Sequence, residues 1–114
     1  MHATMHINDA DLVEGFNSYV ERRLRFALGR FGGRVGYVAV RIGADGKSAS
    51  RCRISAEVLP FGRVAVEESD PDLFIAIDRA TGRIGRLFGR ELERARDARW
   101  DASRSDWRHD INAR

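Results

Sequence analysis

The sequence of 114 residues is poor in several features, and each shortage excludes a class of protein. Its only cysteine, Cys52, cannot form an internal disulfide or supply a cysteine-rich metal site. No stretch approaches the roughly 20 apolar residues that a membrane span needs. The N-terminal segment also lacks the basic and apolar regions of a secretion signal. These shortages predict a cytoplasmic protein without a membrane partner.

Lysine is nearly absent as well, because Lys47 is the only lysine among 20 basic residues. Hydrophobic residues make up 43% and charged residues 32% of the chain, which is typical of one folded domain. The planar fork of arginine matches phosphate oxygens, and the net charge of +3 favours an anionic partner. Codon usage in a GC-rich genome would also enrich arginine, so the positions of the arginines have to decide.

Hydrophobic periodicity predicts one helix followed by three strands. Apolar residues recur at helical spacing from Asp11 to Arg30, and the pair Gly32 and Gly33 ends this helix. Apolar and polar residues then alternate over 35–43, 51–58 and 63–67, with turn residues between these segments. The three strands therefore form an antiparallel meander with one apolar face.

A second helix is predicted to begin at Ser69-Asp70-Pro71 and to run to about Arg96, with its apolar stripe on the sheet. Residues 2–7 could add a fourth strand, parallel to its neighbour. We therefore predict an α+β domain over residues 1–96, of order β-α-β-β-β-α, with two helices on one face of a four-stranded sheet. Residues 97–114 are polar and are predicted to form a flexible tail with a frayed helical start.

Arginines recur along one side of the predicted second helix at spacings of four, three, four and four residues. At about 100° per residue they fall within a sector of roughly 80°, opposite the apolar stripe. We call this row the arginine ridge; its members are Arg79, Arg83, Arg86, Arg90 and Arg94. Acids close enough to neutralise the row are expected to be few, because Glu91 turns toward the apolar side and Glu93 only flanks it. Such a row could follow a phosphate backbone by charge, although a solvated helix face would show the same pattern.

The first helix could extend this basic surface. Arg22 and Arg25 project away from its apolar stripe and would lie near the ridge if the two helices are neighbours on the sheet. Gly82, Gly85 and Gly89 occupy the flank of the second helix, where each costs about 1 kcal/mol relative to alanine. Close approach of the first helix explains them best, and close approach of an RNA backbone is the alternative.

Catalytic groups are scarce. His2 and His6 have no third ligand nearby, Cys52 alternates with core residues, and no phosphate-loop glycine pattern or nucleophile set is present. We expect no enzyme activity, no metal, no cofactor and no small-molecule substrate. Tyr37 is the only aromatic residue predicted for the open sheet face, which disfavours the base-stacking platforms of single-strand RNA binders.

Two segments resemble a known family. The segment Tyr19-Val20-Glu21-Arg22-Arg23-Leu24 and the segment from Asp72 to Asp78, Asp-Leu-Phe-Ile-Ala-Ile-Asp, are similar to motifs of the hibernation-promoting factor and ribosome-associated inhibitor A family. The resemblance covers residues 5–96 and implies the fold given above. The pair Ile7-Asn8 departs from the glycine-arginine pair that usually ends the family's first strand.

The resemblance also implies a function. Family members bind the small ribosomal subunit and its rRNA in the channel used by transfer RNA and messenger RNA. They block translation and protect idle ribosomes during the stress of starvation or stationary phase. The resemblance assigns RNA contacts to Arg22, Arg25, Arg79, Arg83, Arg86 and Arg90, with Arg94 just past the matched part. It implies a short form without a second domain, which we expect to bind as a monomer.

Two other functions fit the same residues. The arginine ridge could meet an acidic protein partner while Trp100 and Trp107 anchor that interface, because aromatic residues are common anchors. A three-stranded meander packed by helices could also serve as a generic double-stranded RNA-binding domain.

Overall fold

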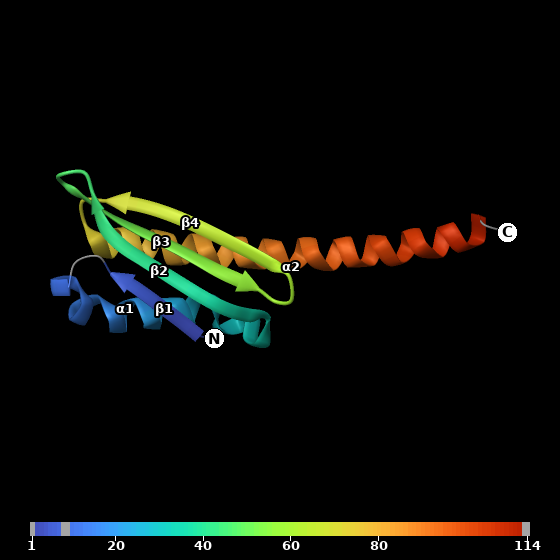
Figure 1. Cartoon of the computed structure of the whole chain (residues 1–114), viewed down its shortest axis with the longest axis horizontal. Coiled ribbons are helices and arrows are strands. Elements are labelled where there is room, and N and C mark those ends of the chain that lie inside the picture. The colour runs from blue at the N-terminus through green and yellow to red at the C-terminus, as the bar shows by residue number, and fades with distance from the viewer. Residues whose placement is uncertain (1, 8–9, 113–114) are drawn as a thin grey trace.

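The computed structural model describes the backbone of residues 2–7 and 10–112 and the side chains of residues 16–97. Its elements are β1 (His2–Ile7), α1 (Ala10–Leu28), a 3-10 helix (Gly29–Arg34), β2 (Val35–Asp45), β3 (Ala49–Val58), β4 (Gly62–Asp70) and α2 (Leu73–Asn112) (Figure 1). The strands lie side by side in the order β1-β2-β3-β4. Both helices lie on one face of this sheet, and the other face is open (Figure 1).

Strands β2, β3 and β4 form the antiparallel meander that the alternation of apolar and polar residues predicts. Val40 is the partner of Ile54, and Ile54 is in turn the partner of Val66. Because side chains on neighbouring strands face the same way in this register, these three residues share the face that the helices cover. The α+β class, the two helices and the three-stranded antiparallel sheet are confirmed. Strand β1 pairs with β2 in parallel.

The core lies between this sheet face and the helices. Its fully buried large side chains include Leu24 and Leu28 from α1, Ile42 and Ile54 from the sheet, and Ile77, Ile84 and Phe88 from α2. Cys52 is buried among them, and desolvation raises the pKa of its thiol to about 12. A thiol with that pKa stays protonated at neutral pH, so the prediction of a small core residue at this position is confirmed.

A β-bulge interrupts the pairing of β2 and β3 between Val35 and Val38. Gly36 lies inside it, and a Cβ atom at this position would come within 3.0 Å of side-chain atoms of Glu57 and Leu59. The backbone N–H of Tyr37 donates a hydrogen bond of 3.0 Å to the Glu57 carboxylate. At the bulge, the Glu57 side chain of β3 thus satisfies a backbone donor of β2.

The start of α2 differs slightly from the prediction. Strand β4 extends to Asp70, and the helix begins at Leu73 rather than at Pro71. Asp72 acts as the cap, because its carboxylate accepts a hydrogen bond of 2.9 Å from the N–H of Phe74.

The end of α2 was predicted wrongly. The helix continues past Arg96 to Asn112 and projects beyond the sheet, giving a chain that measures 67 × 26 × 18 Å (Figure 1). Apolar periodicity fades after Phe88, which suggested an end. However, neither glycine nor proline occurs between Arg90 and Asn112, so nothing in the sequence breaks the helix. The flexibility of residues 97–114 stays a prediction.

Candidate nucleic-acid interface

The basic face of the molecule depends on how α1 and α2 are held together. Asp78 of α2 accepts a short hydrogen bond from the Tyr19 hydroxyl of α1 and forms an ion pair of 3.2 Å with Arg23. The ring of Phe74 packs edge-on against Tyr19 with centroids 5.0 Å apart, and it also contacts Phe16. The two segments that carry the family resemblance thus contact each other. The contacts described between these two segments hold α1 and α2 together.

One glycine of α2 sets the distance between the helices. A Cβ atom at Gly85 would lie 3.2 Å from the carbonyl oxygen of Ala27 and 3.4 Å from its Cβ. Close approach of α1 is therefore confirmed as the reason for glycine at this position. At Gly82 the nearest atom would be a terminal nitrogen of Arg86 at 3.5 Å, which is ordinary contact.

The arginine ridge faces away from the core, but its first two members are neutralised by acids of β4. Arg79 forms an ion pair of 3.2 Å with Asp70, and Arg83 forms one of 2.6 Å with Glu68. The expectation that few acids lie near the row was therefore wrong at this end. The acids are distant in sequence, and the packing of α2 on β4 brings them within reach.

The last member of the ridge is also paired. Two nitrogens of Arg94 donate to the Glu91 carboxylate, at 2.7 Å and 3.1 Å. This hydrogen bonding lowers the pKa of Glu91 and raises that of Arg94. Glu91 therefore compensates Arg94, although its place on the helical wheel suggested that it turns toward the apolar side.

The middle of the ridge carries the uncompensated charge. Arg86 and Arg90 are exposed, and neither has an ion-pair partner among the side chains of residues 16–97. Arg22 and Arg25 of α1 are exposed too, and the Arg22 guanidinium lies 6.0 Å from the centroid of the Tyr19 ring. The structure thus places all seven predicted contact residues at the surface, but it concentrates free positive charge on these four.

A groove runs between the C-terminal half of α1 and the middle of α2. It is lined by Arg23, Phe26, Ala27, Arg30, Gly82, Gly85 and Arg86. Phe26 is 82% exposed, and Arg86 links the groove to the ridge. Sequence reasoning missed Phe26, although an aromatic residue on the polar side of an amphipathic helix was the signal. An exposed ring between guanidiniums can stack on a nucleobase while the arginines bind phosphate.

Among the described residues, no group of three or more His, Cys, Asp or Glu side chains could hold a metal ion. The side chains of His2 and His6 lie outside those residues. No helix in the described part of the chain is long and apolar enough to cross a bilayer.

The fold and this face define a small α+β domain that presents an arginine-rich helical surface. The sequence matches no protein-family model and no curated protein. The solved N-terminal domain of Protein Y from Thermus thermophilus is similar, with a TM-score of 0.68, 31% identity, and coverage of 79% of this chain and 98% of that one. The chain belongs to the hibernation-promoting factor family. A ribosomal subunit interface protein from Coxiella burnetii shares the fold, with a TM-score of 0.68, 11% identity, and coverage of 82% of this chain and 99% of that one.

Proposed function

We propose that this chain is a ribosome hibernation factor that binds the small subunit and its rRNA in the decoding channel. The basic face of α1 and α2 makes the contact, and the bound monomer silences translation and protects idle ribosomes under stress. Family membership and the similarity to a ribosomal subunit interface protein support a ribosomal partner. The proposal includes a cytoplasmic location and the complete β-α-β-β-β-α topology.

The observation that carries this proposal is the pair Arg86 and Arg90. Exposed arginines without an ion-pair partner among the described side chains are available to an anion, and their forks bind phosphate through two parallel hydrogen bonds. Arg22 and Arg25 widen the same surface from the neighbouring helix. These residues contact the phosphate backbone and need no particular base sequence, as a structured rRNA surface requires.

The proposed mechanism is occupancy without turnover. Guanidiniums placed in the channel occupy phosphate sites there and exclude messenger RNA and transfer RNA from the same space. No covalent step is involved, so the protein is not an enzyme. Inhibition must therefore follow the ratio of protein to ribosome.

Cell-free translation tests this proposal directly. The purified chain should inhibit translation in proportion to ribosomes, and excess messenger RNA with initiator transfer RNA should relieve the block. Inhibition at amounts far below the ribosome concentration would point to an enzyme. Full ribosome binding without competition would place the site elsewhere on the particle.

Cosedimentation of the protein with ribosomes separates the members of the ridge. Arg86→Ala with Arg90→Ala should weaken ribosome binding about tenfold or more, because two charged contacts are lost. The matched variant Arg79→Ala with Arg83→Ala should weaken it less, since Asp70 and Glu68 already offset those charges. Equal affinity of the wild type and the first variant would remove the ridge from the site. Sedimentation with free duplex RNA, or with light protein fractions only, would favour the two alternative functions.

A further inference from the structure

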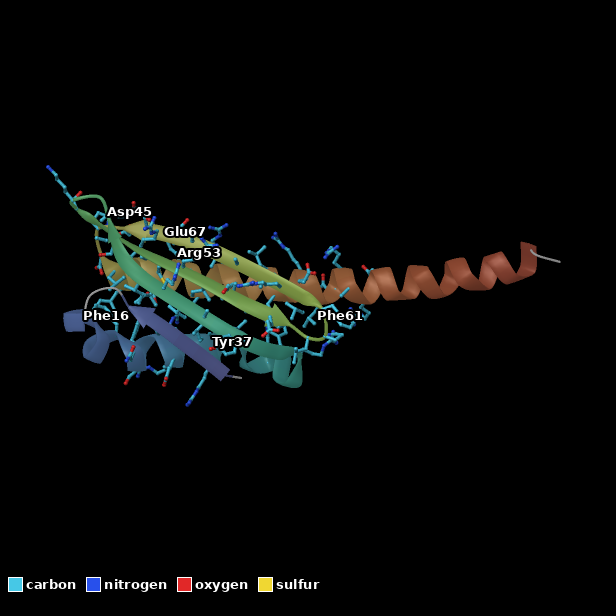
Figure 2. All side chains as sticks on the ribbon, in the orientation of Figure 1. Phe16, Tyr37, Asp45, Arg53, Phe61 and Glu67 are labelled. Carbon is cyan, nitrogen blue, oxygen red and sulfur yellow. The ribbon has the colours of Figure 1, made fainter. Side chains whose placement is uncertain are left out.

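The open face of the sheet, on the side away from the helices, carries a second basic site. A shallow hollow of about 460 Å³ lies there. Its floor is a row of small residues across three strands, in which Ala39 is the partner of Ser55 and Ser55 is the partner of Ala65. Its walls are Arg41, Arg53 and Arg63. We call this site the sheet hollow; Figure 2 labels Arg53 in it, with Glu67 and Tyr37 on the same face.

Two arginines of the sheet hollow are placed where they repel each other. Arg41 and Arg53 are direct partners on neighbouring strands, beside one edge of the small-residue row. Arg63 lies beside the other edge, as the partner of Glu57. Like charges directly opposite each other destabilise a sheet. An anion bound between these guanidiniums would relieve that repulsion.

Glu67 and Glu57 lie on this face opposite hollow arginines, but the carboxylate of each bonds to another group. Glu67 lies opposite Arg53 but forms its ion pair with Arg51, at 3.3 Å. Glu57 lies opposite Arg63, yet its carboxylate accepts the N–H of Tyr37 in the β-bulge. None of the three hollow arginines has an ion-pair partner among the side chains of residues 16–97.

We infer that the sheet hollow binds phosphate groups of an RNA backbone. Guanidinium forks on both sides can hold phosphate oxygens, and a floor of alanine and serine lets a sugar–phosphate chain approach closely. The floor of alanine and serine has no pocket for the large apolar or aromatic side chains that anchor a protein partner, which favours RNA over a protein. Tyr37 is the only aromatic residue in β2, β3 and β4, so the site does not stack successive bases.

This inference rests on the proposed function and extends it. The arginine ridge and the sheet hollow lie on opposite faces of the domain, since α2 covers the face of the sheet that the hollow does not use (Figure 1). A partner that contacts both must surround the domain rather than offer a single flat surface. The bound chain is therefore clamped between two RNA segments.

Ribosome binding measured over a series of salt concentrations tests the sheet hollow. Arg41→Gln with Arg53→Gln should weaken binding about tenfold. It should also reduce the slope of log affinity against log salt by about 2, because two phosphate contacts are lost. The thermal midpoint should stay unchanged or rise, since a like-charge pair is removed. The matched control is Lys47→Gln with Arg96→Gln, which removes the same charge at exposed positions outside both sites.

The outcomes distinguish the two proposals. If the Arg86 and Arg90 variant loses binding while the hollow variant matches the control, the proposed function stands and the sheet hollow is overturned. If the wild type does not bind ribosomes, the proposed function falls. Titration with a labelled oligouridylate and with polyglutamate then decides about the hollow. Weaker binding of oligouridylate by the hollow variant supports the site, whereas an unchanged affinity, or an effect on polyglutamate alone, overturns it.

Discussion

At the scale of single residues, Asp78 connects the two helices on which the basic face is built. It receives both the Tyr19 hydroxyl and the Arg23 guanidinium, so one carboxylate orients two side chains of α1. The hydrogen bond to Asp78 is the main cause that raises the pKa of Tyr19 above its usual value of 10.0, followed by desolvation and by the negative charge of Asp78. The neutral phenol is thus the form that the folded state favours.

Replacing Tyr19 by phenylalanine should make the alkaline stability of the protein less dependent on pH. A raised pKa in the folded state stabilises it fully below the unfolded pKa of Tyr19, and this contribution is lost as the pH rises through the folded pKa. We expect Tyr19→Phe to cost about 0.5–1.5 kcal/mol between pH 7 and 9. The free energies of unfolding of the two proteins should converge once the pH rises above the folded-state pKa of Tyr19, as measured by urea denaturation.

A double-mutant cycle provides the control for this prediction. In the Asp78→Ala background, Tyr19→Phe should have little effect, because the partner of the hydroxyl is already gone. An equal cost in both backgrounds would show that the hydroxyl stabilises the fold by another route.

At the scale of elements, α2 has distinct sides with distinct tasks. Ile77, Ile84 and Phe88 cover the sheet, while Gly85 admits the backbone of α1. The ridge occupies the side opposite the core. Because the helix meets both the sheet and α1, glycine substitutions on its flank test the packing while every arginine of the ridge is kept.

Two glycine substitutions on that flank should have opposite effects. Gly85→Ala should lower the free energy of unfolding by about 1 kcal/mol or more, because its Cβ would press on the Ala27 carbonyl oxygen and force the helices apart. Gly82→Ala should raise it by up to about 1 kcal/mol, since alanine favours the helix and meets only the flexible end of Arg86. Urea denaturation of both variants measures the difference. Stabilisation by Gly85→Ala would contradict the close contact.

At the scale of the whole molecule, α2 extends well beyond the packed domain to which it belongs. The last fully buried core residue among the described side chains is Phe88, yet α2 continues to Asn112 (Figure 1). Figure 2 labels Phe61 at the turn between β3 and β4, and this side chain is 97% exposed. The helix passes this turn near Glu91 and Arg94, which line a groove shared with Phe61.

Truncation after Asp97 should separate the domain from the projecting helix. We expect the helical circular dichroism signal at 222 nm to fall by a larger fraction than the fraction of residues removed, because the removed residues up to Asn112 belong to α2. The urea midpoint should stay the same, because the described core ends before the cut. A lower midpoint would show that the removed turns pack against the domain.

The sequence alone was sufficient to predict the main helices and strands and which side of each is apolar. The alternation in β2 to β4, the helical stripe of α1 and the row from Arg79 to Arg94 are local patterns, and local periodicity decides which side of an element is apolar. It also determined the family resemblance. It did not locate the end of α2, because a polar segment without glycine or proline can remain helical.

Only the tertiary structure decided which arginines are free. Glu68 and Asp70 neutralise the start of the ridge because α2 packs beside β4, and no spacing in the sequence brings them together. The sheet hollow depends on the register of three strands, which sets Arg41 opposite Arg53 and brings Arg63 to the same small-residue row. Charge compensation acts through distances in space, whereas the sequence orders residues along the chain. For that reason the sequence was sufficient to predict a basic protein, whereas the fold determined which of its positive charges are free to bind a partner.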